Sequence, residues 1–354
     1  MDVGIALPTK ADSWRIAGRA ESLGFTHAWF YDTALLNAEI FVAMGAAAVS
    51  TSRIRLCTGV LTPSNRIAPV AASGLATLNA LAPGRIIFGV GTGFTGRRTL
   101  GHGPVTLKAM ETYIRAIEGL LRGETISYEM EGLHAKTRFM TSESDIINIR
   151  DPIPTHISAF GPKGRRLTAV LGAGWIGSMG TLHTERAALA DMQGKWLRQG
   201  REPGNLYSTL VGGGCVLNTG ESAGSARARA QAGVCAAVLF HSLVEQDDFG
   251  EGLLDQSFPF REELEAYRAV YMGYQPEDAR YLENHRGHLM FLRPEETHIT
   301  ERVIRNLTLT AERGELVDRL RGIRDAGYDQ LAITLPPGQE QDMMETWADV
   351  VARI

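Results

Sequence analysis

Five short segments combine glycine with side chains that can contact a ligand. They are Tyr31-Asp32-Thr33, Cys57-Thr58-Gly59-Val60, Gly91-Thr92-Gly93-Phe94, Ala159-Phe160-Gly161-Pro162 and Gly177-Ser178-Met179-Gly180. Four of the five contain glycine, and backbone without side chains lets a planar ligand or a phosphate approach closely. We therefore expect these segments to hold a cofactor that supplies the chemistry of the site.

Metal and triad chemistry find little support in the sequence. The five segments contain no His-x-His, no clustered acids and no Cys/His pair at ligand spacing, so we expect no metal site. No Ser/His/Asp arrangement is visible either. His285 and His288 leave three possibilities open: contact with a substrate, a place in an exposed loop, or a two-histidine metal site with the spacing of neighbouring helical turns. We expect His241 to be packed within a helix and His183 to cap one.

Apolar strands alternate with amphipathic helices along the chain. The expected strands are 2–7, 27–31, 54–60, 86–90, 155–160, 175–179, 206–217 and 330–335. The expected helices are 13–23, 40–49, 67–81, 110–121, 163–171, 185–197, 222–243, 315–323 and 342–351. Continuous apolar strands separated by helices are typical of a parallel sheet.

Eight such strands in a chain of this length favour a (β/α)8 TIM barrel, and we expect one domain over residues 1–354. Residues 246–300 are rich in charge and aromatic rings, and we expect an irregular insertion there, before the last βα unit and over the mouth of the barrel. Catalytic groups of such barrels lie at the C-terminal ends of the strands, where the five segments stand.

Composition narrows the class of protein. The chain has 354 residues, 44% hydrophobic and 21% charged, with a formal net charge of −4. No basic block suggests a nucleic-acid partner, and no apolar run reaches the length of a membrane span. Three separated cysteines give neither a disulfide framework nor a metal motif, and the N-terminus reads as a strand rather than a signal peptide. We expect a cytoplasmic protein that acts on a small molecule.

Three ordered motifs resemble the bacterial-luciferase-like superfamily of flavin- and deazaflavin-dependent oxidoreductases. The first is RIRLCTGV followed by ALAPGRIIFGVGTG within residues 53–93, the second is PIPTHISAFGPKG with GAGWI within 152–176, and the third is ELVDRLRGIRDAGYDQLAI at 315–333. Together they span nearly the whole chain. The spelling of GVGTG and GPKG is closer to the deazaflavin-dependent, methylenetetrahydromethanopterin reductase-like branch.

The resemblance implies a cofactor, FMN or the deazaflavin coenzyme F420, at the C-terminal mouth. By analogy, Gly59 and Val60 form a bulge, often with a non-proline cis peptide, behind the central ring. Gly91, Thr92 and Gly93 lie along one side of the ring. The phosphate-binding segments correspond to Gly161-Pro162 and Ser178-Met179-Gly180, with Lys163 as a further charge partner. Homodimers are common in the family, so we expect one here.

The sequence departs from the sugar-phosphate dehydrogenase branch at three positions. That branch has a His after the Asp of strand two, a Glu after the glycines of strand four, and a phosphate-binding Lys, whereas this chain has Thr33, Phe94 and Thr181. We expect Asp32, Thr33 and Phe94 to line the catalytic pocket, although Asp32 also fits a structural carboxylate. The departures predict a more apolar pocket than a sugar phosphate needs.

The leading hypothesis is hydride transfer between reduced coenzyme F420 and a small, fairly apolar organic substrate. An FMN-dependent monooxygenase that uses reduced flavin and oxygen is the alternative. A barrel that binds flavin without catalysis is the second alternative, because the acid/base pair of the sugar-phosphate branch is missing. A phosphate-binding barrel without any flavin was also considered.

Overall fold

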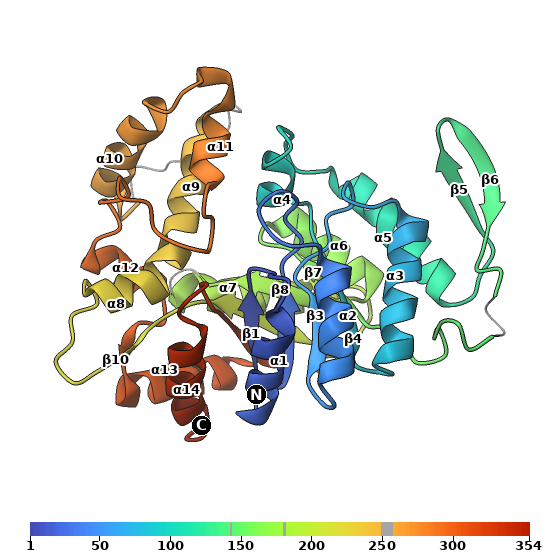
Figure 1. Ribbon diagram of the computed structural model, residues 1–354, viewed down its shortest axis with the longest axis horizontal. Coiled ribbons are helices and arrows are strands. Elements are labelled where there is room, and N and C mark those ends of the chain that lie inside the picture. Colours follow the sequence, from blue (N-terminus) through green and yellow to red (C-terminus); the bar gives the residue numbers. More distant parts are fainter. Residues whose placement is uncertain (142–143, 180–181, 249–257) are drawn as a thin grey trace.

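Eight parallel strands close into a barrel in the computed structural model, which describes all residues except 142–143, 180–181 and 249–257 (Figure 1). The strands are β1 (Asp2–Leu7), β2 (His27–Phe30), β3 (Arg55–Thr58), β4 (Ile86–Val90), β7 (Thr155–Ser158), β8 (Gly174–Ser178), β9 (Ser208–Gly212) and β12 (Gln330–Thr334). They run round the barrel in chain order, and β12 pairs with β1 to close it. This confirms the predicted (β/α)8 barrel.

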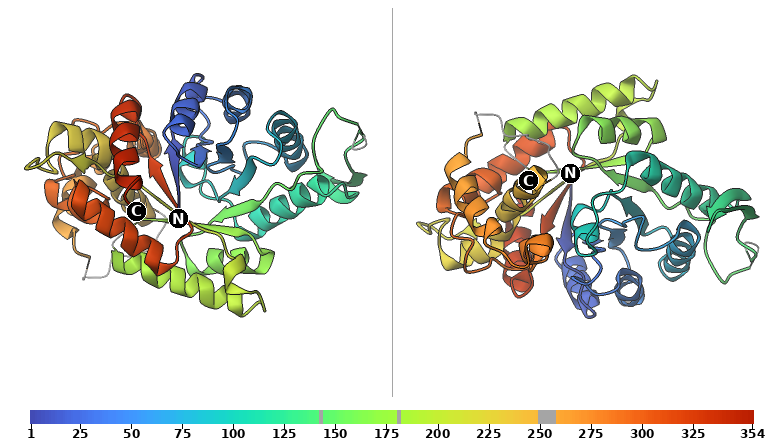
Figure 2. Two further views of the ribbon diagram at one scale, coloured as in Figure 1. Left: turned by 90° about the horizontal axis from the view of Figure 1, so that it is seen from below. Right: turned by 90° about the horizontal axis from the view of Figure 1, so that it is seen from above.

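Helices surround the barrel, as the two views of Figure 2 show. They are α1 (Ser13–Ser22), α2 (Ile40–Ser50), α3 (Ala68–Leu81), α4 (Phe94–Arg98), α5 (Leu107–Leu121), α6 (Pro162–Leu171), α7 (Leu182–Leu197), α13 (Arg313–Ala326) and α14 (Glu340–Val351). A hairpin of β5 (Ile126–Met130) and β6 (Leu133–Thr137) extends to one side. The predicted helices all exist, within a few residues of their expected ends.

The segment between β9 and β12 forms a helical unit on one side of the barrel (Figure 1). Its helices are α8 (Ala226–Ala228), a π-helical turn (Arg229–Gly233), α9 (Val234–Asp248), α10 (Arg261–Met272), α11 (Arg280–His285) and α12 (Glu301–Leu307). These helices have an apolar core of their own, from Cys215 to Ile304. The insertion does stand before the last βα unit, but its described part is mostly helical, so the prediction of an irregular segment over 246–300 was wrong.

The signal for these helices was present in the sequence. In α10 the buried residues are Leu264, Tyr267 and Tyr271, at the three- and four-residue spacing of an amphipathic helix. The predicted strand 206–217 also divides, into β9 and β10 (Val216–Leu217). A Cβ at Gly214 would lie 2.0 Å from the carbonyl oxygen of Leu309, so the chain turns there in close contact with the strand β11 segment (Ala311–Glu312) that pairs with β10.

Candidate active site

The order of the strands brings the predicted segments together. Neighbouring strands β3, β4, β7 and β8 run parallel, so the segments that follow them lie side by side at one end of the barrel. The short helix α4 follows β4 at that end, and the insertion rises on the same side (Figure 1). The strand ends and α4 therefore share one mouth with the insertion.

Side chains fill the barrel below this mouth. Trp29, Cys57, Ile87 and Ile176 form a buried cluster within it, and the Trp29 indole donates to Gln330 Oε1 at 3.0 Å. The half-buried residues Tyr31, Val60 and Val211 pack against this cluster. The barrel is thus a packed core rather than a pore, and any ligand sits above it.

The peptide bond between Gly59 and Val60 is cis, as the resemblance implied for this bulge. Both residues are half-exposed at the mouth. A Cβ at Gly91 would lie 2.7 Å from Val60 Cγ2, so glycine at this position lets the Val60 side chain lie against the end of β4. The bulge and the end of β4 form one continuous surface.

Gly93 is explained by its backbone and its neighbour. Its φ of +77° lies in the left-handed region, and a Cβ there would lie 2.3 Å from Thr62 Cγ2. The Thr92 carbonyl accepts from the amide of Val105 at 3.0 Å. Packing alone therefore accounts for glycine at 91 and 93, while the role of these residues beside a ring stays a prediction.

The predicted phosphate side lies at the start of α6. Gly161, Pro162 and Lys163 are exposed, and a Cβ at Gly161 would meet nothing within 4 Å. The first amides of a helix have no intrahelical acceptor and face its N-terminal end, which suits an anion. Ser178 is exposed at the adjacent strand end, Met179 is half-exposed, and Gly180, like Thr181, lies outside the described residues.

These features fit a cofactor with a planar ring and a phosphate. Phe160 at the end of β7 is 63% exposed, and Val60 and Phe94 are half-exposed, so an apolar surface is available for a ring. Next to it, the start of α6 offers amide donors and Lys163. In this arrangement Val60 would back the ring and the first turn of α6 would hold the phosphate.

Asp32 is tied into the structure by Arg66. The Arg66 Nη1 donates to both carboxylate oxygens of Asp32 at 2.9 and 3.0 Å, and the amide of Thr62 donates to Oδ2 at 3.2 Å. Burial lowers the pKa of Arg66, but the carboxylates of Asp32 and Glu39 outweigh this effect and raise it. The geometry agrees with a structural carboxylate that fixes the loop after β2, where the half-exposed Thr33 also lies.

Phe94 begins α4 and faces the insertion. Its ring meets the ring of His285 edge-on, with centroids 5.4 Å apart. His285 and His288 are both buried, so the reading of these two residues as an exposed loop was wrong. His241 is buried within α9, as expected, and is also hydrogen-bonded. The side chain of His183 lies outside the described residues.

The sequence did not reveal the polar partners of these histidines. Glu245 accepts from Arg98 Nε at 2.7 Å and from the Asn284 amide at 2.7 Å, and it lies 3.0 Å from His285 Nε2. Burial raises the pKa of Glu245, but the neighbouring His285, Asn284 and Arg98 outweigh burial and hold it below its usual value. A buried ion pair thus joins α4 to the insertion, between residues far apart in the chain.

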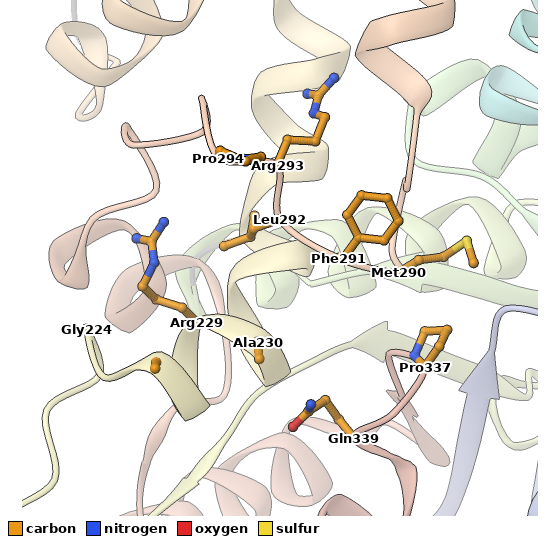
Figure 3. A pocket seen from close by; sticks show the side chains of 11 residues that line it. Gly224, Arg229, Ala230, Met290, Phe291, Leu292, Arg293, Pro294, Pro337 and Gln339 are labelled. Carbon is orange, nitrogen blue, oxygen red and sulfur yellow. The ribbon is translucent and has the colours of Figure 1, made fainter.

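A cavity of about 600 Å³ lies elsewhere on the insertion (Figure 3). Its lining includes Arg229, Met290, Phe291, Pro337 and Gln339, from the π-helical turn, the chain after α11 and the loop after β12. No residue of the β3, β4 or β7 ends lines it. We assign the candidate active site to the strand ends and not to this cavity, because the predicted site residues meet there.

Among the described residues, no group of three or more His, Cys, Asp or Glu side chains could hold a metal ion. Within the same part of the chain, no helix is both long enough and apolar enough to cross a membrane.

The Asp32–Arg66 contact gives a test of the structural role of Asp32. We expect Asp32→Asn to lower the free energy of unfolding by about 1–3 kcal/mol, because Arg66 loses its buried charged partner. The control is Glu39→Gln, which removes the half-exposed partner of the same guanidinium and costs at most about 1 kcal/mol. Urea unfolding followed by circular dichroism measures both, and equal stability of the two variants would contradict the role.

Comparison with known proteins supports this reading of the fold and the site. The chain is 35% identical over 155 residues to an F420-dependent glucose-6-phosphate dehydrogenase of Beutenbergia cavernae, covering 40% of this chain and 44% of the relative. It is 30% identical over 151 residues to a 5,10-methylenetetrahydromethanopterin reductase of Methanolobus tindarius, covering 41% and 43%. The chain thus spans less than half the length of these curated relatives.

Among solved structures, the fold is similar to coenzyme F420-dependent tetrahydromethanopterin reductase from Methanopyrus kandleri. The TM-score is 0.69 at 18% identity, over 98% of this chain and 97% of that one. An F420-dependent secondary alcohol dehydrogenase in complex with an F420-acetone adduct gives 0.68 at 15% identity, over 99% and 98%. The profile of the family described as luciferase-like monooxygenase matches residues 4–330. This chain therefore belongs to the luciferase-like monooxygenase family.

Proposed function

We propose that the protein is an oxidoreductase that uses coenzyme F420 and transfers a hydride to or from a small, fairly apolar organic substrate. The observation that carries the proposal is the mouth itself, where the Gly59–Val60 bulge and the exposed start of α6 offer a surface for a ring and a place for a phosphate. Relatives that match at the sequence level are F420-dependent enzymes by name.

The bound cofactor would supply the hydride chemistry, and this chain would supply alignment and exclusion of water. In our proposal Val60 and Gly91 support one face of the ring, and the first turn of α6 binds the phosphate. The opposite face would then be open toward Phe94, α4 and the insertion, where the substrate binds. Contacts between the insertion and α4 support a role of the insertion in substrate choice.

The substrate differs, in this proposal, from the sugar phosphate of the dehydrogenase relatives. Thr33 and Phe94 stand where that branch has its His and Glu, and Phe94 presents an apolar ring toward the insertion. The apolar side chains of Val60, Phe94 and Phe160 around the mouth support an apolar substrate.

Purified protein mixed with F420 and separately with FMN tests the cofactor, followed by the absorbance of each ring and the mass of any bound species. We expect saturable binding of F420 and turnover with a panel of alcohols, ketones and enones. Binding of FMN alone, with oxygen uptake, would instead support the monooxygenase. Tight binding without turnover on the whole panel would support a binding protein, and no binding of either cofactor would overturn all three readings.

Phe94→Glu tests the position of the substrate. We expect the affinity for F420 to be kept and kcat to fall by about 10–100-fold, because a carboxylate disturbs the apolar substrate side of the ring. Phe94→Leu is the matched control and should retain most of the activity. Loss of F420 affinity with normal turnover per bound cofactor would show that this strand end is misplaced in our account.

We further propose a homodimer formed through α2 and α3, and the cytoplasmic location stays a prediction. Val42 and Val49 on α2 are 72% and 68% exposed, and Ile67 and Val70 beside them are also exposed. The residues of α2 are apolar on all faces, which suits a helix covered on both sides. A second copy of this chain, through the same patch, would cover it.

Sedimentation of Val42→Asp tests the dimer. We expect the wild-type protein to sediment as a dimer and this variant as a monomer, because a buried unpaired charge opposes association. Leu133→Asp, which changes an exposed apolar residue of the hairpin, should remain dimeric. A monomeric wild type, or a dimeric Val42→Asp, would contradict the proposed interface.

A further inference from the structure

A row of side chains connects the mouth to the interior of the insertion. Thr95 Oγ1 on α4 lies 3.2 Å from His288 Nε2. His288 Nδ1 lies 3.5 Å from His241 Nδ1, and His241 Nε2 lies 2.5 Å from Glu296 Oε1. Thr95 is half-exposed at the mouth, whereas the two histidines and Glu296 are buried. The row thus begins where a substrate can reach it and ends at a buried carboxylate.

The two histidines are neutral in the resting protein. Burial lowers the pKa of His241, and burial together with the neighbouring His285 and His241 lowers the pKa of His288 well below its usual value. Burial raises the pKa of Glu296, but His241 and Arg293 outweigh burial and hold it below its usual value, so this residue is a carboxylate.

Each hydrogen in the row has one possible place. A carboxylate oxygen at 2.5 Å requires a proton on His241 Nε2, since Arg293 Nη2 also donates to this oxygen, at 2.8 Å. The Nδ1 of neutral His241 is then an acceptor, so the proton of His288 must be on its Nδ1. His288 Nε2 is left as an acceptor for the hydroxyl of Thr95. All the donors in the row point toward Glu296.

Such a row is suited to accept a proton at the mouth. The strand ends give no other group for this task, because Thr33 and Phe94 replace a His and a Glu, and Asp32 is paired with Arg66. Conversion of an alcohol to a carbonyl removes a hydride from carbon and a proton from oxygen. The proton needs an acceptor within reach of the substrate oxygen.

We propose that this row is a proton relay that serves hydride transfer at the mouth, a proposal that rests on the function proposed above. The relay runs from Thr95 through His288 and His241 to Glu296. Its substrate class is therefore an alcohol and the corresponding carbonyl compound. The group that contacts the substrate oxygen is the hydroxyl of Thr95, and the other three side chains act through it.

The proton transfers balance in both directions. The hydroxyl proton of the alcohol passes to Thr95 Oγ1, the Thr95 proton to His288 Nε2, and the His288 Nδ1 proton to His241 Nδ1. The hydride leaves the same carbinol carbon with its electron pair for the oxidised cofactor, so the carbonyl forms. His241 ends as an imidazolium beside the Glu296 carboxylate, and the reverse sequence returns the proton when a carbonyl is reduced.

The imidazolium is a short-lived state in this environment. The charged and titratable groups around the two histidines are Tyr267 on α10, Glu245 on α9, His285 on α11, Arg98 on α4, and Arg293 and Glu296 after α11. Arg293 and His285 oppose a positive charge on His241, whereas Glu296 stabilises it. The 3.5 Å contact between the histidines is long, and contacts of this kind shorten in the reacting complex.

The tautomer of His288 tests the relay without any cofactor. Long-range proton–nitrogen NMR spectra of the full chain labelled with nitrogen-15 histidine distinguish the two neutral tautomers. His288→Gln and His241→Gln assign the signals. We expect neutral His288 with its proton on Nδ1 and neutral His241 with its proton on Nε2. A His288 proton on Nε2 would overturn the relay.

Kinetics with oxidised F420 and cyclohexanol test the same relay in turnover. We expect His288→Gln to keep the F420 dissociation constant and to lower kcat/KM by about 10²–10³-fold. The fall of kcat/KM at acid pH, where the histidines become protonated, should disappear in this variant. His298→Gln is the control, since His298 stacks on Tyr267 at 4.3 Å in the same insertion but outside the row.

The results separate the relay from the proposed function. Turnover by the wild-type protein with unchanged kcat/KM in His288→Gln would overturn the relay and keep the function. Equal losses in His288→Gln and His298→Gln, with no change in the pH profile, would also overturn it and show a structural role. Absence of F420 binding would overturn the function, and the tautomer of His288 would then decide the relay alone.

Discussion

The buried ion pair between Arg98 and Glu245 joins the two parts of the molecule. Its Nε–Oε2 distance is 2.7 Å, and both side chains are almost fully buried. Arg98 ends α4, directly after β4, and Glu245 lies in α9 of the insertion. Removing one partner of such a pair leaves a buried charge without compensation, so the two partners hold each other in place. The position of α4 against the insertion, and with it the arrangement of the mouth, depends on this contact.

This constraint gives the mouth two different sides. On the barrel side, the Gly59–Val60 bulge, Gly91 and the start of α6 offer packed backbone and apolar side chains. On the insertion side, histidines and carboxylates lie buried behind Phe94 and Thr95. We interpret the first side as the binding surface of the cofactor and the second as the substrate side, in a family whose barrel hosts several reactions.

The barrel could be predicted from the sequence because its signal is local. Apolar strands, amphipathic helices and glycine at helix ends repeat along the chain, and each needs only a short window to be seen. The strand-end rule then placed Gly59, Gly91 and Gly161 at one mouth, which the structure confirms. The actual reason for glycine at 91 and 93 was not visible, since it lies in contacts with Val60 and Thr62 across the barrel.

The polar groups of the insertion could not be predicted in the same way. Glu245, His285 and Arg98 come together from segments far apart in the chain, and no spacing rule relates them. Asp32 shows the same limit, because its partner Arg66 follows the next strand and decides that the carboxylate is held in place. A single sequence gives the residue types of such a network, whereas packing decides which of them meet.

A crystal structure of the protein with F420 bound tests the central claim most directly. Our account places the deazaflavin ring against the Gly59–Val60 bulge, its phosphate at the first turn of α6, and its open face toward Phe94 and Thr95. A ring bound in the cavity beside Arg229 and Phe291, or a phosphate far from α6, would contradict it.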